Sequence, residues 1–496
     1  MNIRRLLRMM IWLLVIGTLL TAVAAWLAYR AIDRSPNDLL RYTERRLIGH
    51  PKLELVALPV IHHLRAAIER PVADGLTPSM QGKGAQTQPL PPQQYDAAGR
   101  PLPVAADALA RPVVAQSQGR VVRVAGSEEL VRAVIEATPG TTIELLPGTY
   151  PHLGDLKTQR PGTPAAPILV RARQPGSAIL EFEGGEGFRV AHSYWQFENL
   201  DMRGVCKEDA WCEHAFHIYD AARGVVVRNN RISNFNAHIK VNGVDGRWPD
   251  YGLLQYNTLT NSAPRRTGLP TTPFDLVGAN GWTVADNVVS NFVKLEGNQI
   301  SYGLFMKGGS HEGRIERNLL VCSLHDISLP GVRVGISMGG GTTTQGFCRD
   351  KVCATEHTRG VVANNIVAHC NDAGIDVNRS NQILVAHNIL INTAGITLRD
   401  PISSARIEAN LLEGNVHARD GALTEMRDNL IGSLHRRFVD ADRLDLGWRD
   451  TPAAVPADPQ VGDDFCRRKR SASTLPGAFD SAAPCTAKPA GEASHI

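Results

Sequence analysis

A degenerate repeat constrains the fold of this chain more than any other feature. A short stretch rich in leucine or β-branched residues ends in Asn, and the pattern recurs at Asn199, Asn230, Asn257, Asn287, Asn318, Asn365, Asn388, Asn410 and Asn429. The spacing is too short for separate domains and fits one coil of a solenoid per repeat. We therefore predict that the Asn side chains form an internal polar ladder, hydrogen-bonded from coil to coil.

A second recurring stretch lies between the Asn positions and alternates apolar with variable residues. It is seen in residues 303–307, 335–339, 374–378 and 395–399, each of which begins with Gly. This alternation is the period of a half-buried strand, and β-branched residues dominate over any ten-residue helical pattern. The sequence thus predicts an all-β solenoid whose coils bury their apolar faces by stacking.

The 496 residues divide into five predicted parts. They are an N-terminal membrane anchor or uncleaved signal (1–32), a juxtamembrane helical segment (33–70), a Pro/Gln/Ala-rich linker (71–120), the solenoid (121–440), and a C-terminal cap and tail (441–496). A short amphipathic helix over 127–137, with Ser127 as its N-cap, is predicted to cap the first coil.

The predicted anchor is an uncharged run over residues 11–29 that follows Arg4, Arg5 and Arg8. A helix of this length spans about 28 Å at ~1.5 Å per residue, close to the thickness of a bilayer core. We expect a single-pass protein of a bacterial inner membrane, with its N-terminus in the cytoplasm and its solenoid in the periplasm. Secretion after signal cleavage is the alternative.

Eight cysteines agree with an oxidising compartment. Close spacing or matching repeat positions predict four disulfides, which are Cys206–Cys212, Cys322–Cys370, Cys348–Cys353 and Cys466–Cys485. A zinc site is the alternative, although the chain has no CxxC pair. The net charge is +4, but the basic residues form no continuous patch in the sequence, so a nucleic-acid partner is not expected.

Aligning the strands on their apolar positions predicts two outward columns of side chains. The first is His217, Lys240, Asp275, Phe305, Ser337, Asp376, Thr397 and His417, and the second is Tyr219, Asn242, Val277, Lys307, Gly339, Asn378, Arg399 and Arg419. With strands ~4.8 Å apart, Lys240, Asp275 and Lys307 are expected within about 10 Å of one another.

Such a surface suits a polymer whose sugars carry carboxylates. Removal of the proton alpha to a uronate carboxylate needs a base and a nearby positive charge. We predict Lys307 as the base, with Arg333, Asp275, Lys240 and His325 as further catalytic candidates. Predicted substrate contacts are Asn378, Arg379, Arg399 and Arg419 for carboxylates, and Trp248 and Tyr251 for stacking on sugar rings.

Three aspartates, Asp326, Asp372 and Asp376, are candidate ligands of a calcium ion, although aspartates in turns usually cap backbone amides. A long insertion over residues 332–358 is expected to wall the groove.

The chain also resembles right-handed parallel β-helix proteins of the pectate-lyase-like superfold. Residues 139–150 and 162–172 look like the opening coils of the chondroitinase B and alginate lyase branch, and Pro476-Gly477-Ala478-Phe479 looks like its ending. The resemblance implies a Lys base aided by an Arg one coil on, often with calcium. Lys307 resembles that Lys, whereas the next coil has Gly339 at the Arg position and the nearest Arg is Arg333.

The predicted function is therefore cleavage of an acidic, uronate-containing polysaccharide by β-elimination. A non-catalytic glycan-binding scaffold of the cell envelope is the main alternative. Two lesser alternatives are a glycoside hydrolase with paired carboxylates such as Asp275 and Asp376, and a uronate epimerase. The oligomeric state is left open by the sequence.

Overall fold

The computed structural model describes residues 17, 39–40, 43, 47, 51–68, 83–104, 119–324, 329–340, 343–481 and 485. The predicted membrane anchor lies outside these residues apart from Gly17. No helix within the described residues is both long and apolar enough to cross a membrane. The predicted juxtamembrane segment contains one described helix, α3 (Pro51–Ile68).

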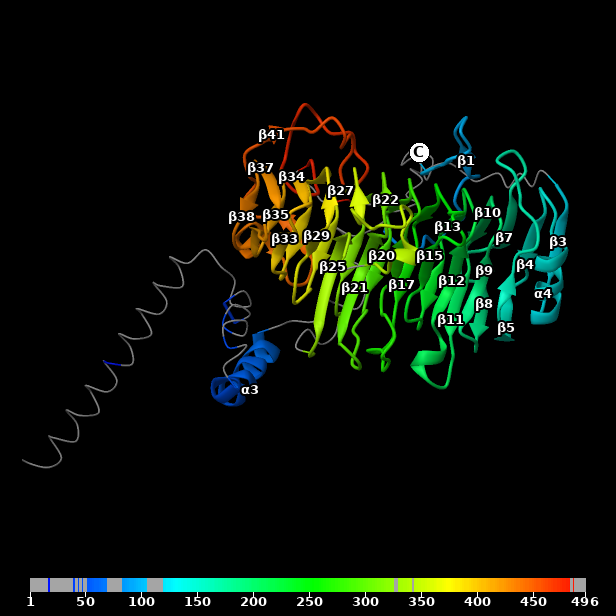
Figure 1. Cartoon of the computed structure of the whole chain (residues 1–496), viewed down its shortest axis with the longest axis horizontal. Coiled ribbons are helices and arrows are strands. Elements are labelled where there is room, and N and C mark those ends of the chain that lie inside the picture. Colours follow the sequence, from blue (N-terminus) through cyan, green and yellow to red (C-terminus); the bar gives the residue numbers. More distant parts are fainter. Residues whose placement is uncertain are drawn as a thin grey trace, which may run out of the picture.

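Three long parallel sheets wind around one elongated core (Figure 1), and within the described residues they contain twelve, eleven and ten strands. Each turn of the chain contributes one strand to each sheet, so neighbours in a sheet come from successive coils. This strand order is that of a parallel β-helix.

Sheet 1 consists of β3 (Val121–Val124), β4 (Thr142–Leu145), β7 (Ile168–Ala172), β10 (Trp195–Glu198), β13 (Val226–Arg228), β16 (Leu253–Gln255), β19 (Thr283–Ala285), β23 (Arg314–Glu316), β27 (Val361–Ala363), β31 (Ile383–Ala386), β34 (Ser404–Glu408) and β37 (Leu423–Arg427). Sheet 2 consists of β5 (Gly148–Leu153), β8 (Ala178–Phe182), β11 (Asp201–Gly204), β14 (Arg231–Ser233), β17 (Thr258–Thr260), β20 (Val288–Ser290), β24 (Leu319–Val321), β28 (Ile366–Ala368), β32 (Ile389–Ile391), β35 (Leu411–Leu412) and β38 (Leu430–Ile431).

Sheet 3, which carries the predicted site, consists of β6 (Leu156–Lys157), β9 (Glu186–Val190), β12 (His214–Tyr219), β15 (Ile239–Asn242), β18 (Phe274–Val277), β21 (Ile300–Lys307), β25 (Val332–Met338), β29 (Ile375–Asn378), β33 (Gly395–Arg399) and β36 (Asn415–Ala418). Smaller sheets pair β1 (Gln94–Tyr95) with β2 (Pro101–Leu102), β39 (Phe438–Asp440) with β40 (Asp445–Trp448), β41 (Val455–Pro456) with β42 (Ser473–Thr474), and β22 (Ser310–His311) with β26 (His357–Thr358) and β30 (Ser380–Asn381). Single 3-10 turns are η3 (Asp209–Trp211), η4 (Gln345–Phe347) and η5 (Leu434–Arg436).

The core is built from aligned apolar columns. In sheet 3, Ile239 pairs with Phe274 and Val241 with Leu276, and all four side chains are fully buried. Each such side chain contributes roughly 1.5–3 kcal/mol by leaving water. Because a slip of one residue would send these side chains to the surface, the apolar columns fix the strand register.

The Asn ladder is present along eight of the nine predicted positions. Within it each Nδ2 donates to Oδ1 of the next rung at 2.8–3.1 Å, from Asn230 through Asn257, Asn287, Asn318, Asn365, Asn388 and Asn410 to Asn429. Asn199 was wrongly predicted as a rung. It aligns with Asn229, whose Nδ2 donates to Asn199 Oδ1, and Leu200 occupies the rung position, with its N–H bonded to Asn230.

A left-handed residue precedes every rung and explains that one-residue offset. Residues with positive φ stand immediately before the rungs at Tyr256, Asp286, Arg317, Asn364, His387, Ala409 and Asp428, and Asn199 and Asn229 share this position. Asn tolerates the left-handed conformation well. The rung and the position before it therefore both accept Asn, and the sequence alone does not show which of the two an Asn occupies.

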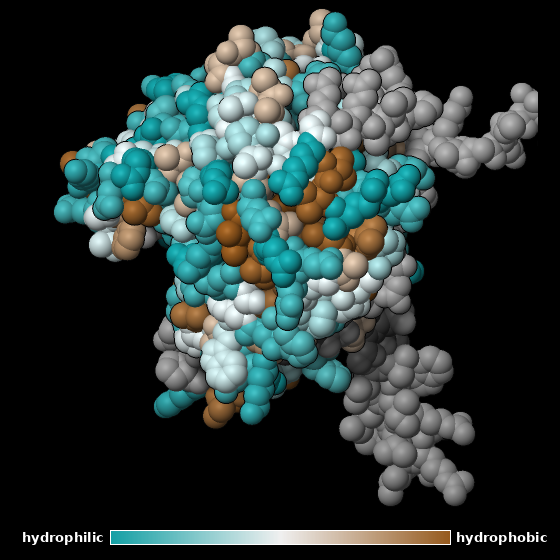
Figure 2. Space-filling view, turned by 90° about the vertical axis from the view of Figure 1, so that its right-hand side faces the viewer, coloured by the Kyte–Doolittle hydropathy of each residue, from teal (hydrophilic) through white to brown (hydrophobic). Residues whose placement is uncertain are grey.

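Helix α4 (Ser127–Glu136) caps the first coil as predicted, with Leu130, Ala133 and Val134 buried. Ser127 is not its N-cap, however. Gly126 holds that position, and the Ser127 hydroxyl donates to Pro151 O at 2.7 Å instead. Seen from this end, the surface is largely hydrophilic with small apolar groups (Figure 2). Two apolar side chains of α4, Val131 and Ile135, are half-exposed.

The linker prediction is wrong for residues 83–104, which we call the strap. The strap forms a hairpin through β1 and β2 and lies along sheet 1. Pro91 O of the strap accepts a 2.8 Å hydrogen bond from the Arg228 guanidinium, and Val104 N donates a 2.9 Å hydrogen bond to Gln255 Oε1. Side chains of sheet 1 thus satisfy the strap's polar groups, which composition alone does not reveal.

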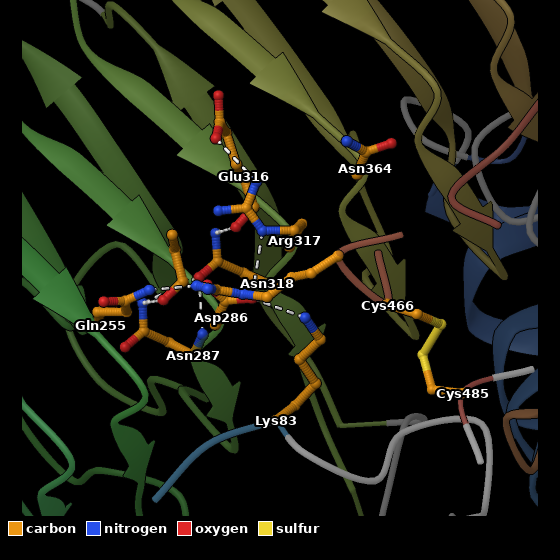
Figure 3. A network of polar contacts seen from close by, with 12 residues as sticks. Lys83, Gln255, Asp286, Asn287, Glu316, Arg317, Asn318, Asn364, Cys466 and Cys485 are labelled. Atoms are coloured by element: carbon orange, nitrogen blue, oxygen red, sulfur yellow. Dashed lines mark hydrogen bonds and ion pairs between the residues drawn. A yellow bond between two sulfur atoms is a disulfide. The ribbon is translucent and has the colours of Figure 1, made fainter. Parts of the chain in front are cut away.

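The start of the strap meets Asp286 through Lys83 (Figure 3). The end of the strap meets the C-terminal segment, where Arg467 donates to Val104 O. Asp286 is fully buried and binds Lys83 at 2.7 Å, Arg317 at 3.3 Å and Arg467. Burial by itself raises the pKa of Asp286, but these three cations outweigh it and hold the pKa well below its ordinary value. A single carboxylate therefore joins the strap, the β-helix and the C-terminal segment.

The structure contains all four predicted disulfides, with Cα–Cα distances of 5.0–5.7 Å. Cys322–Cys370 links neighbouring coils inside the core, and Cys466–Cys485 holds the C-terminal segment next to Arg467. The zinc alternative is excluded because every cysteine of the chain is paired.

Candidate functional site

The outward face of sheet 3 carries the two predicted columns. His217, Lys240, Asp275 and Phe305 stand opposite one another on four successive strands. The column continues through Ser337, Asp376, Thr397 and His417. Residues distant in the chain therefore form one continuous surface.

At the centre of this surface, Asp275 lies between two lysines. Lys240 Nζ lies 2.5 Å from Asp275 Oδ2, and Lys307 Nζ lies 3.7 Å from Oδ1. The carboxylate is 7% exposed, whereas the two lysine side chains are 22% and 24% exposed. We call these three residues the lysine centre.

The ionisation of Asp275 follows from this arrangement. Burial by itself raises the pKa of a carboxyl, but Lys240 and then Lys307 outweigh burial and lower the pKa of Asp275 to about 2. Asp275 is therefore charged at neutral pH. The centre therefore places two partly exposed lysine side chains beside one ionised carboxylate.

An aromatic platform supports Lys307. Its Nζ lies 4.2 Å from the centre of the Phe305 ring, and Phe305 stacks on Tyr302 at 4.4 Å. A Cβ at Gly340 would lie 2.3 Å from the Phe305 ring, so only glycine fits beside the platform. Tyr302 is out of phase with the outward columns, and strand alternation therefore did not predict it.

His217, next to Lys240 in the first column, is held between two acceptors. Its Nδ1 contacts Glu186 Oε1 at 2.7 Å and its Nε2 contacts Asn242 Oδ1 at 2.8 Å. Neighbouring His214 is buried, and burial, followed by the charges of His217 and Lys240, lowers its pKa to about 4. His217 was predicted to face outward, but its partner Glu186 was missed, because it lies 31 residues away.

The long insertion contacts the coil that contains Lys307. Arg349 N donates to Gly308 O at 2.9 Å, and the Arg349 guanidinium binds both oxygens of Asp250 at 2.7 and 2.9 Å. Buried Glu356 accepts a 2.7 Å hydrogen bond from Gly308 N. These contacts pin the insertion to the coil that contains Lys307.

The two aromatic residues predicted to stack on sugar rings, Trp248 and Tyr251, pack against neighbouring residues of the protein. Trp248 fills the space over Gly243 and Gly278, and Arg349 lies 5.5 Å above its ring. Tyr251 packs on Gly281, and Arg223 lies 4.4 Å from its ring. Both side chains are half-buried.

A pocket of about 330 Å³ opens farther along sheet 3, and Asp372, Asp376, Thr397, Arg399, His417 and Arg419 line it. Arg399 Nη2 donates to Asp376 Oδ2 at 2.9 Å, and the Asp376 residue is 2% exposed. Burial raises the pKa of Asp376, and the Arg399 charge opposes this without cancelling it.

The remaining predicted residues are placed away from the lysine centre or outside the described part. Arg333 is 1% exposed and donates to the carbonyls of Leu329 and Pro330. It pairs with Ser301, six residues before Lys307 on the same strand, which is about 20 Å. His325 and Asp326 lie outside the described residues.

The predicted carboxylate-binding residues are largely engaged with acids of the same surface. Ion pairs join Arg399 to Asp376 at 2.9 Å, Arg379 to Asp400 at 3.6 Å and Arg419 to Asp420 at 3.7 Å. Asn378 pairs with Arg399 on the next strand and is 7% exposed.

The geometry does not support Asp275 and Asp376 as the paired carboxylates of a glycoside hydrolase. Asp275 and Asp376 are separated by Phe305 and Ser337 in one column, so three strand spacings place them about 14 Å apart. That separation exceeds the 5–9.5 Å typical of glycosidase carboxylates. Among the described residues, no three His, Cys, Asp or Glu side chains gather as a metal site, and Asp376, a candidate calcium ligand, binds Arg399.

Comparison with known proteins gives similar folds and no relative. No protein-family model and no curated protein matches the sequence. Among solved structures, the alginate lyase from Paenibacillus sp. str. FPU-7 is 14% identical, with 63% of this chain and 99% of that chain covered and a TM-score of 0.34.

Two further structures give similar values. Pectate lyase Pel9A is 15% identical over 73% of this chain and 98% of its own, with a TM-score of 0.42. The A-module of the Azotobacter vinelandii mannuronan C-5 epimerase AlgE4 is 14% identical over 64% and 93%, with a TM-score of 0.39. At this level of similarity the fold rests on the chain's own strand pairing, which is that of a parallel β-helix protein.

Proposed function

We propose that the protein binds an acidic polysaccharide along the outward face of sheet 3 and cleaves it by β-elimination at the lysine centre. The observation that carries this proposal is buried Asp275 between two partly exposed lysines. A buried carboxylate that holds two lysines toward solvent places a cation for the substrate carboxylate beside a second amine that acts as the base.

The two lysines differ in their contact with Asp275, and this difference supports different roles. Lys240, which contacts Asp275 at 2.5 Å, is assigned to neutralise the uronate carboxylate. Lys307, which is held less closely at 3.7 Å, is assigned as the base. The free amine of Lys307 takes the proton alpha to the carboxylate, which leaves an enolate-like intermediate that Lys240 stabilises.

The second step needs no further reactant. The electron pair of the intermediate forms the carbon–carbon double bond while the bond to the glycosidic oxygen breaks. The new ammonium of Lys307 returns its proton to that oxygen, so Lys307 ends as the free amine. The products are an unsaturated uronate end and a new hydroxyl end.

The test is ultraviolet absorbance of the conjugated uronate while the purified full-length chain is incubated with alginate, pectate, chondroitin, dermatan or heparin. We expect a rise on at least one polymer that is lost in Lys307→Ala. The control Lys469→Ala removes an exposed lysine of the C-terminal segment and should keep the rise. Binding with no rise on any polymer would reject the lyase and favour the glycan-binding scaffold.

Export with an N-terminal membrane tether is part of the same proposal. It is supported by the uncharged run over residues 11–29 and by four disulfides, which form in oxidising compartments. The test is fractionation of expressing cells followed by an alkaline carbonate wash and N-terminal sequencing. A chain that starts beyond residue 29 and washes off the membrane would show a cleaved signal instead.

A further inference from the structure

The two halves of sheet 3's outward face differ in charge. The lysine centre places two lysines beside one carboxylate. The 330 Å³ pocket pairs Arg399 with Asp376, and Asp372 and Arg419 also line it, so two guanidinium groups balance its two carboxylates. A second uronate carboxylate would meet two acidic side chains there, and both guanidinium groups are already paired with acids, Arg399 with Asp376 and Arg419 with Asp420. The pocket is therefore built for a group without charge.

The pocket offers both hydrogen-bond donors and acceptors around an uncharged ligand. Asp372 and Asp376 supply acceptor oxygens, Arg399 supplies N–H donors, and the half-buried Thr397 hydroxyl does both. Tyr302 pairs in register with Val334, which lines the pocket, and it stacks on Phe305 at 4.4 Å. Oriented ion pairs beside an aromatic wall suit the hydroxyls and the apolar face of a neutral sugar ring.

The separation of the two sites fits one ligand. Lys307 is on β21 and Asp376 is on β29, with only β25 between them. Two strand spacings are about 10 Å, which an oligosaccharide of a few residues spans. Phe305 contacts Lys307 on one side and Tyr302 on the other, so the surface is continuous between the sites.

We propose that the pocket formed by Asp376, Arg399 and Thr397 binds the neutral sugar of a polysaccharide in which uronate and neutral residues alternate. This inference rests on the proposed function, since it takes the uronate to lie at the lysine centre. It narrows the substrate from any uronate polymer to an alternating one.

The test compares two probes on the full-length protein by calorimetric titration. Unsulfated chondroitin hexasaccharide alternates glucuronate with N-acetylgalactosamine, and hexagalacturonate contains uronate alone. We expect chondroitin to bind about tenfold more tightly, the effect of one or two added hydrogen bonds. Equal affinity, or tighter binding of hexagalacturonate, would overturn the proposal.

Two variants show whether the pocket causes the preference. Asp376→Asn removes the charged acceptor, and Thr397→Trp fills the pocket from an outward, half-buried position. Both should reduce the affinity ratio to near one. Thr397→Trp should change hexagalacturonate binding by less than about twofold, whereas Asp376→Asn, which frees Arg399, should tighten it. Equal weakening of both probes would assign these residues to the fold. If Asp376→Asn does not fold, Thr397→Trp decides, because its side chain adds no cavity to the core.

The failure of the proposed function would look different. Lys307→Ala should abolish the ultraviolet rise and keep the preference for chondroitin. Selective binding without any elimination by the parent protein would reject the lyase and support the pocket. Elimination on pectate with no preference between the probes would support the lyase and reject the pocket.

Discussion

Lys83 and Asp286 are 203 residues apart in the chain, yet Lys83 Nζ donates a 2.7 Å hydrogen bond to Asp286 Oδ1. Arg317 and Arg467 bind the same buried carboxylate from the β-helix and from the C-terminal segment. Asp286 is thus a junction of three parts of the molecule.

Replacement of Asp286 by Asn should be among the most destabilising single changes. Asp286→Asn leaves three buried cations without their carboxylate, at a cost of about 3–5 kcal/mol in the free energy of unfolding. Urea unfolding followed by tryptophan fluorescence measures this cost. Asp420→Asn, at a 65% exposed side chain, is the matched control and should change stability by less than about 0.5 kcal/mol. Similar small shifts in both variants would contradict the junction.

Asp275 should give the protein a defined acid sensitivity. Its folded pKa of about 2 lies below the ordinary value of 3.8. The ionised group therefore contributes stability above pH 4, and this contribution, roughly 2 kcal/mol, is lost as the pH falls toward 2. Urea midpoints measured from about pH 5 down to about pH 2 should fall less steeply in Asp275→Asn than in the parent. Parallel curves would show that the lysines do not stabilise Asp275.

The Asn ladder should be more sensitive in its middle than at its end. Asn318 makes five side-chain hydrogen bonds inside the core, whereas Asn429 is the half-buried last rung. We expect Asn318→Ala to cost about 3 kcal/mol, because it leaves several buried amides without partners, and Asn429→Ala about 1 kcal/mol. Chemical denaturation compares the two variants. Equal losses would mean that the rungs act independently of burial.

Gly340 should matter for activity because it borders the Phe305 platform. Gly340→Ala places a Cβ 2.3 Å from the ring, so Phe305 and the Lys307 ammonium above it must move. We expect elimination at least about tenfold slower, since small displacements of a catalytic group have effects of this size. Gly346→Ala lies in the same insertion and meets nothing within 4 Å, so it should keep the parent rate. The ultraviolet assay compares both, and equal rates in all three proteins would remove Phe305 from the site.

Much of the fold was readable from local patterns. Period-two alternation predicted which residues of sheet 3 face outward, and the strand pairing from Lys240 to Asp275 and on to Phe305 has that register. The ladder position was missed by one residue at Asn199, since Asn also suits the left-handed position before each rung.

The site was predicted in part for the same reason. Lys240, Asp275 and Lys307 lie on regular strands, so spacing alone brought them together. The partners of His217 and Arg399, the position of Tyr302, and the contact of Arg349 with Asp250 depend on how side chains from different coils orient. No local period encodes those contacts.

The sequence by itself determined the coil, the outward columns and the cysteine pairs, because each follows from a repeat or spacing along the chain. Only the tertiary structure decided that residues 83–104 are a packed strap and not a linker, and that the arginines of sheet 3 are paired with acids. The reason is physical. Burial of the apolar face fixes strand register locally, whereas charge pairing depends on which groups meet across distant parts of the chain.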